Sequence, residues 1–183
     1  MKWSESRIAS ALARQVFQGK HLVVVPNCSW PGSECDLLVV TRDLRIIDVE
    51  IKISRSDFKA DAKKDKWFHN WDFRIDGPYG RSGNPARRPV EWPRKVWKHY
   101  YAMPKEVWAP EMVEFLPSPN SGVILITENA YARSGIAVSV ERVAKPCSDA
   151  KTIAAADAID IARLASLRMW DAFDRFEHAG VAK

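Results

Sequence analysis

The hydrophobic positions of this chain follow two periods, and each period predicts a different kind of element. Ile8, Leu12 and Val16 recur every four residues, which predicts a helix over residues 4–17 that Ser4 can cap. Short apolar runs are instead typical of buried strands. Such runs occur at 21–25, 35–41, 45–53, 96–103 and 121–127, and the alternating stretch 135–143 predicts an edge strand.

Two more helices are predicted, one after the strand at 45–53 and one after the strand at 135–143. Ser54 opens a helix over 54–70, with Asp57 three residues later as in a capping box. A long helix over about 150–177 carries an apolar seam, which either packs on the sheet or forms a homodimer interface. The seam consists of Ala158, Ile161, Ala165, Met169, Ala172 and Phe176, widened by Leu164, Leu167 and Phe173.

The elements together predict one α/β domain with a mixed sheet. At 183 residues the chain is long enough to bury a core of its own. Residues 72–93 contain three glycines and four prolines, which indicates an irregular insertion at about 70–95. We expect a domain over 1–147 and a helical extension over 148–183 that packs on it.

The strands at 35–41 and 45–53 form a hairpin whose pairing can be predicted. If the turn centres on Asp43, Asp36 faces Glu50 and Leu38 faces Asp48. Residues that face each other across an antiparallel pair point to the same side of the sheet. One face of the hairpin is then wholly apolar and is expected to carry Cys35, Leu37 and Val39 against Ile51, Val49 and Ile47. The other face brings Asp36, Glu50 and Lys52 together, with Asp48 beside them.

These three polar residues point to phosphate chemistry. Two neighbouring carboxylates ionise together at low cost only when a cation lies between them. Oxygen ligands suit Mg²⁺ or Mn²⁺. Lys52 can orient or deprotonate a water molecule, or neutralise charge that develops on phosphorus. The pattern is also compatible with a solvent-facing salt bridge of little energetic value.

Composition and charge limit the classes of partner, metal site and cellular location that the sequence allows. The net charge is +5, and the stretch 70–98 holds seven basic and three acidic residues, which favours an anionic partner such as DNA. Three cysteines without CxxC spacing and four scattered histidines disfavour a zinc site. No apolar run reaches the roughly 18 residues of a membrane span. The first residues lack the apolar core of a signal peptide, so we expect a cytoplasmic protein.

Asp36 followed by "EIK" at 50–52 resembles the PD-(D/E)xK nuclease superfamily. The stretches "CDLLVV", "IIDVEIKISRSDFKADAKKDKW", "HYYAMPKEV" and "LPSPNSGVILI" are similar to its MmcB-like branch, which is associated with DNA repair. The resemblance covers roughly residues 4–143, apart from the insertion. The family's proline before the first acid is here Cys35. Membership implies a restriction-endonuclease-like αβββαβ core and metal-dependent cleavage of DNA.

The resemblance also implies roles for individual residues. Asp36, Glu50 and Ile51 would bind Mg²⁺ or Mn²⁺, Lys52 would be the catalytic lysine, and Glu5 a further carboxylate from the first helix. The helix after the site, with Ser54, Asp57, Asp61 and Lys66, would line its mouth. Asp48 shares the face of Glu50 and is either a third ligand or a peripheral residue. The residues expected to contact the DNA backbone are Ser54, Arg55, Lys59, Lys63, Lys66, Arg74, Arg81, Arg87 and Arg88.

Two other functions remain open at this point. The first is a non-catalytic DNA-binding or repair-accessory protein on the same fold. The second is a structural protein that assembles through its C-terminal helix. Trp67, Trp71, Trp92 and Trp97 flank the basic insertion. Aromatic residues among basic ones can stack on unpaired bases, although anchoring a loop to the core is the more common role.

Overall fold

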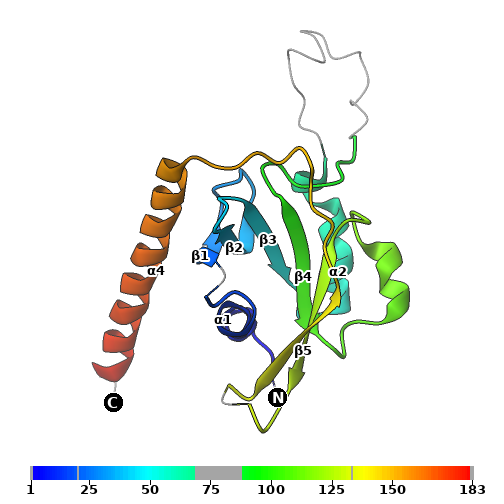
Figure 1. Ribbon diagram of the computed structural model, residues 1–183. Coiled ribbons are helices and arrows are strands. Elements are labelled where there is room, and N and C mark those ends of the chain that lie inside the picture. The colour runs from blue at the N-terminus through cyan, green and yellow to red at the C-terminus, as the bar shows by residue number, and fades with distance from the viewer. Residues whose placement is uncertain (1, 20, 69–87, 133, 182–183) are drawn as a thin grey trace, which may run out of the picture.

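A six-stranded mixed sheet forms the centre of the protein, as the computed structural model shows (Figure 1). The structure describes residues 2–19, 21–68, 88–132 and 134–181. The strands lie side by side in chain order. They are β1 (His21–Cys28), β2 (Cys35–Thr41), β3 (Ile46–Ile51), β4 (Lys98–Pro104), β5 (Gly122–Glu128) and β6 (Ile136–Arg142).

The sheet is antiparallel at both edges and parallel in the middle. β1, β2 and β3 are antiparallel neighbours, β3, β4 and β5 run parallel, and β6 returns antiparallel to β5. A parallel pair needs a long crossover, and the chain between β3 and β4 supplies it. That crossover contains helix α2 (Arg55–Ala60) and the short turns η1 (Asp61–Lys63) and η2 (Asp65–Trp67).

The predicted register of the hairpin is confirmed. Leu38 pairs with Asp48 and Val40 with Ile46, as a turn centred on Asp43 requires. Leu37, Val39, Ile47, Val49 and Ile51 all lie in one apolar cluster. Cys35 was placed wrongly: it packs with Leu38 and Ile46 on the opposite face. Strict alternation does not extend to the first residues of β2.

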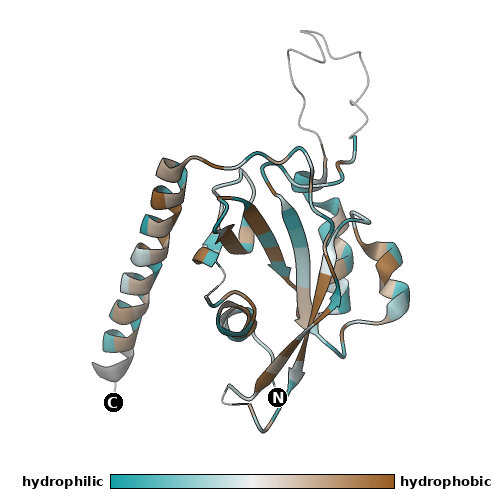
Figure 2. Ribbon diagram, viewed as in Figure 1, coloured by the Kyte–Doolittle hydropathy of each residue, from teal (hydrophilic) through white to brown (hydrophobic). Residues whose placement is uncertain are grey.

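Helix α1 (Glu5–Gln15) covers this apolar face. Ser4 is its N-cap and accepts a hydrogen bond from the Arg7 N–H, as the sequence predicts. Ile8 and Leu12 are fully buried against the strands. In Figure 2 the strands beneath the helix are mostly brown, that is, apolar. Burial of these side chains drives α1 onto the sheet.

The opposite face is covered in two parts. The first turns of α4 (Ala155–Val181) bring Ala158 and Ile161 onto Val25, Leu38 and neighbouring residues of β1 to β3. Helix α2, η2 and η3 (Pro110–Phe115) cover β4 and β5, where Phe58, Trp67 and Met112 are buried. Asp48 and Glu50 of β3 lie between these two apolar areas, on the same face.

Several boundaries differ from the sequence predictions. The C-terminal helix begins at Ala155 and not near 150, and two other differences bear on the sheet and the site. β1 continues through Pro26, which pairs with Leu37. Proline is tolerated there because β1 is an edge strand, so its missing N–H breaks no ladder bond. The helix predicted over 54–70 stops at Ala60, and Lys64 has an extended backbone with a ψ of 144°. The helix ends there because Lys64 and Lys66, which follow it, pair with Glu50 of β3.

The long C-terminal helix packs over only its first part. Ala158, Ile161 and the partly buried Ala165 contact the sheet, which confirms the predicted seam there. Beyond them Met169 and Phe176 are exposed, the latter to 77%. In Figure 1 the helix runs past the edge of the sheet with its lower half away from the domain. Among the described residues, no helix is long and apolar enough to cross a membrane.

Candidate active site

Three charged side chains of β3 and the residue after it lie inside the protein. Asp48 and Glu50 are 0% exposed and Lys52 is 3% exposed. Asp48 and Glu50 sit opposite His99 and Tyr101 of the parallel strand β4. The Lys52 N–H donates to the carbonyl oxygen of Ala102 and so extends the ladder past the end of β3. A solvent-facing salt bridge on a half-exposed sheet is therefore excluded.

The crossover after α2 supplies the groups that surround them. In a continuous helix Lys66 would lie about 140° around the axis from Asp61, so both could not face the sheet. The chain instead breaks at Lys64 between η1 and η2. This break lets Asp61, Lys64 and Lys66 all point toward Glu50. We call Asp48, Glu50, Asp61, Lys52, Lys64 and Lys66 the carboxylate–lysine cluster.

Glu50 is the centre of the cluster. Its Oε2 accepts from Lys52 Nζ at 3.0 Å and from Lys64 Nζ at 2.8 Å. Its Oε1 accepts from Lys66 Nζ at 2.6 Å. Three lysines thus converge on one buried carboxylate. Asp48 and Asp61 balance the charge: Lys66 also pairs with Asp48 at 3.1 Å, and Lys52 and Lys64 each pair with Asp61 at 2.8 Å.

Neutral side chains hold Asp61 through hydrogen bonds, and the His99 ring lies beside Asp48. Asp61 accepts from the Tyr101 hydroxyl at 2.5 Å and from Trp67 Nε1 at 3.2 Å. The Nε2 atom of His99 lies 3.8 Å from Asp48, and its Nδ1 is hydrogen-bonded to Ser121. The Asp48 Oδ1 atom has no hydrogen-bond partner among the described residues. Asp61 is thus held by two neutral donors besides the lysines, whereas the described hydrogen bond to the Asp48 carboxylate comes from Lys66.

Burial and the lysines act in opposite directions on these carboxyl groups. Burial alone would raise the pKa of Glu50, but Lys66 and Lys52 outweigh it and the pKa lies below its usual range. The same balance lowers the pKa of Asp61 strongly. The carboxylates in turn raise the pKa of Lys52 despite its burial. The two carboxylates thus hold Lys52 as an ammonium ion that donates to Glu50 and Asp61.

Asp36 lies at the edge of the cluster and has a different electrostatic state. Its Oδ2 accepts from the Ile51 N–H at 2.7 Å, which ties it across to β3. Burial and the nearby charge of Glu50 raise its pKa to about 6, against the pull of Lys52 and Lys64. Asp36, Glu50 and Lys52 are thus brought together, as the hairpin register predicts. With Asp36 ionised, four carboxylates face three lysines.

Solvent reaches the cluster at Lys64. Its side chain is 47% exposed, whereas the side chains of Lys52 and Lys66 are 4% and 2% exposed. Lys66 was predicted to contact DNA, and this is wrong because its ammonium group is buried against Asp48 and Glu50. Lys64 was missing from the predicted site and is its most accessible member.

The other predicted residues lie around or away from the cluster. Ser54 caps α2 by accepting from the Asp57 N–H at 3.2 Å. The guanidinium of Arg55 donates to the carbonyl oxygens of Val107 and Glu106. Lys59, Lys63 and Arg88 are exposed. Arg74, Arg81 and Arg87, like Trp71, fall outside the described residues.

Glu5 does not join the site. It is exposed in the first turn of α1, which covers the face of the sheet opposite to Glu50. Its position near a helix N-terminus is favourable for a carboxylate in any case. Within the described residues it makes no contact with Asp36 or with the cluster. The helix-borne carboxylate of the cluster is Asp61, which follows α2.

The oxygen atoms of this site are the type of ligand that Mg²⁺ prefers. Among the described residues, no group of three or more His, Cys, Asp or Glu side chains has the arrangement of a preformed metal site. Asp36 and Glu50 remain as a neighbouring pair, and both oxygens of Glu50 already receive lysine ammonium groups. A cation at this pair would have to displace Lys64, the lysine whose side chain is free to move into solvent.

The fold and the site define an α/β protein with a buried charged cluster on one face of a mixed sheet. No family model and no curated protein matches the chain. A solved structure does match it, that of the SPO1766 protein of unknown function from Silicibacter pomeroyi. The two are 20% identical with a TM-score of 0.52, and the match covers 96% of this chain and 92% of that one. The likeness concerns the fold alone.

Proposed function

We propose that this protein is a metal-dependent nuclease that hydrolyses phosphodiester bonds in DNA. The observation that carries the proposal is the meeting of Asp36, Glu50 and Lys52 at one end of the β2–β3 hairpin. The order of a helix, three antiparallel strands, a crossover helix and a parallel strand supports a restriction-endonuclease-like core. The resemblance in sequence to the PD-(D/E)xK superfamily supports the same assignment.

The charge balance of the cluster leaves room for one divalent cation, Mg²⁺ or Mn²⁺. With Lys64 turned out to solvent, Asp36, Asp48, Glu50 and Asp61 face only Lys52 and Lys66. When all four carboxyl groups are ionised the remaining charge is −2, which a divalent ion neutralises. Burial raises the pKa of Asp48 and of Asp36, so binding of the ion would favour their ionised forms. Mg²⁺ commonly uses one or two protein carboxylates and completes its shell with water and substrate phosphate. Asp36, Glu50 and the backbone of Ile51 would hold it, and when bound it would polarise the phosphate and acidify a water molecule.

The remaining chemistry falls to residues of the chain itself. Lys52 stays protonated between Glu50 and Asp61, so it can donate to a phosphate oxygen as negative charge develops there. Asp61 holds Lys52 in place and is itself fixed by Tyr101. Lys64, once released from Glu50, becomes a cation at the mouth of the site. Lys59, Lys63 and Arg88 are exposed and available for the DNA backbone.

A cleavage assay tests the proposal. We expect the purified protein to cut at least one of a panel of labelled duplex, single-stranded, flapped and mismatched DNAs with Mg²⁺ or Mn²⁺, and to stop in EDTA. Lys52→Met should cut at least about 100-fold more slowly, because removing one preorganised donor typically costs that much. Glu111→Gln changes an exposed polar residue far along the chain and serves as the control. Failure of wild type to cut any substrate would refute the assignment.

A non-catalytic DNA-binding protein is the second candidate. It is favoured by the saturation of Glu50, whose two oxygens are already occupied by three lysines. On this reading the lysines neutralise the cluster permanently and no ion enters. The same panel discriminates: DNA binding without cleavage, unchanged by Mg²⁺, would select the second candidate.

We further propose that two copies associate through α4. Met169, Trp170, Phe173 and Phe176 continue past the part of α4 that packs on the sheet and are all exposed. Exposed apolar patches of this kind mark interaction surfaces. Two antiparallel copies that cross at Phe173 would bring Trp170 of one level with Phe176 of the other, so their exposed apolar side chains would cover each other.

We expect a dimer in light scattering that Phe173→Asp converts to a monomer. Burying a charge at an apolar contact between helices is costly, so the effect should be at least tenfold in the dissociation constant. Tyr131→Asp is the matched control, because Tyr131 is fully exposed in the turn between β5 and β6. A wild-type protein that stays monomeric at high concentration would contradict the proposal.

A further inference from the structure

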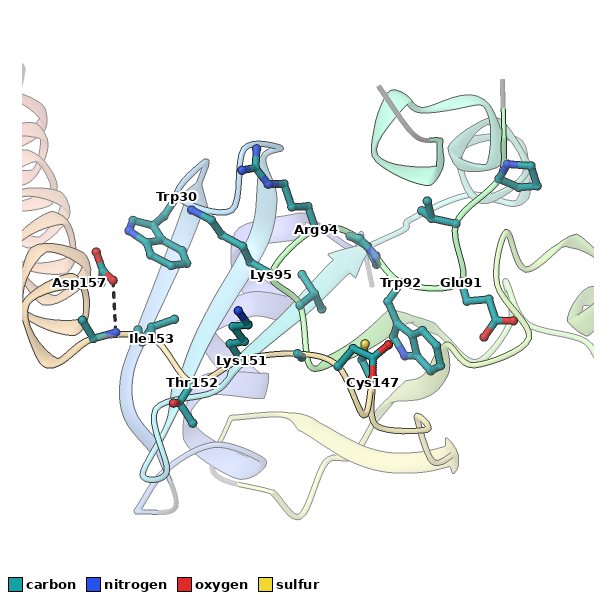
Figure 3. Close-up of a pocket in the computed structure, with 17 residues that line it drawn as sticks. Trp30, Glu91, Trp92, Arg94, Lys95, Cys147, Lys151, Thr152, Ile153 and Asp157 are labelled. Carbon is teal, nitrogen blue, oxygen red and sulfur yellow. Dashed lines mark hydrogen bonds between the residues drawn. The ribbon is translucent and has the colours of Figure 1, made fainter. Parts of the chain in front are cut away.

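A cleft separate from the carboxylate–lysine cluster lies beside the start of α4 (Figure 3). Its volume is about 860 Å³, within the usual range for ligand sites. Three segments form it: the loop that carries Trp30, residues 89–96 before β4, and the linker 147–157 that leads into α4. We call it the Trp30 cleft.

Backbone hydrogen bonds hold the walls of the cleft in place. The Cys147 N–H donates to the Trp97 carbonyl oxygen at 2.7 Å, and the Ile153 N–H donates to that of Leu44 at 2.8 Å. Val96 and Ile153 are buried with residues of β1 to β3 and give the cleft an apolar base. The cleft is therefore part of the folded domain and does not depend on a ligand to form.

Two indole rings line the cleft. Trp92 is fixed through its Nε1, which donates to the carbonyl oxygen of Lys145 at 3.2 Å. Trp30 is partly buried and lies beneath the ammonium group of Lys95, which is 4.2 Å from the ring centroid. Figure 3 shows Trp30 and Lys95 on the same side of the cleft. The ammonium group of Lys95 covers one face of the Trp30 ring, so a flat aromatic ligand can stack there only when that group moves aside.

Three cations line the same space without a carboxylate partner. Arg94, Lys95 and Lys151 are exposed, and within the described residues none of them forms an ion pair. The backbone of Lys95 has a φ of 63°, in the left-handed region that residues with a side chain rarely adopt. Strain of this kind is kept where the surrounding structure fixes it, often at binding sites.

The three carboxylates of the cleft are each satisfied elsewhere. Glu91 accepts from the Asn120 side chain, Asp149 from Ser148, and Asp157 from the Ala154 N–H at the start of α4. The lining therefore carries three charges of each sign, and among the described residues its three cations are not tied to its three carboxylates. An aromatic surface with unpaired cations beside it fits a ligand that has both a flat ring and a phosphate.

We propose that the Trp30 cleft binds an unpaired nucleotide of the DNA strand. The base stacks on Trp30, and Arg94, Lys95 and Lys151 contact the flanking phosphates. This inference deepens the proposed function and rests on it for the choice of DNA, since it names single-stranded DNA as part of the substrate. Duplex DNA is excluded from the cleft because its bases already stack on one another.

Binding of oligothymidine in EDTA, followed by anisotropy of a dye on the strand, tests the inference without cleavage. Trp30→Leu should weaken binding about tenfold or more, because stacking of one base contributes on the order of 1–3 kcal/mol. The double variant Lys95→Ala/Lys151→Ala should weaken it further at low salt and lower the salt dependence. Binding of a blunt duplex should change less than threefold in Trp30→Leu.

The matched control is Lys2→Ala/Lys105→Ala, which removes the same charge from exposed positions outside the cleft. Arg94→Ala, an exposed position, covers the case in which Trp30→Leu folds poorly. Cleft variants that bind oligothymidine as tightly as the control would overturn the inference, and so would tighter binding of oligouridine.

The two proposals fail in different ways. If the protein binds oligothymidine through Trp30 but cuts no DNA, the proposed cleft is supported and the proposed nuclease activity is refuted. If the protein cuts DNA but the cleft variants bind and cut like wild type, the nuclease activity is supported and the proposed cleft is refuted.

Discussion

Replacing Glu50 with alanine is expected to lower the free energy of unfolding by about 3–5 kcal/mol, the usual cost of breaking a buried ion pair from one side. The carboxylate is 0% exposed and compensates three lysines within 3.0 Å. Without it, Lys52 and Lys66 remain buried with only Asp48 and Asp61 to balance them. A typical domain has about 5–15 kcal/mol in total, so the variant should be close to unfolding.

Urea denaturation followed by tryptophan fluorescence measures this loss. Asp43→Ala is the control, since it breaks the exposed pair between Asp43 and Arg45 and should cost less than about 1 kcal/mol. Glu50→Gln separates charge from shape, because the amide oxygen still accepts one ammonium group. It should fall between the other two variants. A loss below about 1 kcal/mol in Glu50→Ala would show that the cluster does not stabilise the fold.

Asp36→Asn is expected to abolish cleavage and yet to stabilise the protein at pH 8. Even residues that only orient a metal ligand contribute about 10–100-fold to activity, so loss of a ligand should cost at least about 100-fold. The stability gain follows from the pKa of Asp36, which burial and Glu50 raise from 3.8 to about 6. The folded protein holds that proton more tightly, so its stability falls as pH rises from about 4 to 6. Asparagine cannot ionise, so the variant does not lose this stability as the pH rises.

Thermal melts at pH 4 and pH 8 test the sign of the effect. The variant should melt above wild type at pH 8, and the difference should shrink as the pH falls below 6. Mg²⁺ should raise the melting temperature of wild type at pH 8 and leave the variant unchanged, since only the folded wild type binds the ion. A variant that is less stable than wild type at both pH values would show that Asp36 is not strained by its charge.

The sequence was most informative about the hairpin that carries Asp36, Glu50 and Lys52. Alternation in two short strands and a turn at Asp43 were sufficient to predict the register that β2 and β3 adopt. The prediction succeeded because antiparallel neighbours joined by a tight turn have few possible pairings. It failed only at Cys35, at the start of β2, where the side chain turns to the opposite face.

The residues that complete the cluster were not predictable in the same way. Asp61, Lys64 and Lys66 lie in a stretch whose composition favours a continuous helix, and a helix would have turned Lys66 away from the sheet. The attraction of Glu50 for buried ammonium groups outweighs helix propensity there, because unpaired buried charge costs far more than one lost turn. Tyr101 of β4, whose hydroxyl donates to Asp61, lies 40 positions further along the chain. The available signals were the density of lysines at 59–66 and the family resemblance, which places Asp61 and Lys66 at the mouth of the site but not inside it.

The parallel pairing of β3 with β4 has a consequence for how the protein folds. The β2–β3 hairpin can close early because its strands are adjacent in the chain, whereas β3 meets β4 only after the whole crossover has been placed. Asp61, Lys64 and Lys66 belong to that crossover, so the partners of Glu50 arrive in the same late step. The hairpin before this step carries uncompensated carboxylates and stays solvated. We therefore expect the cluster to assemble in the same step that pairs β3 with β4, so that a partly folded chain would have no site.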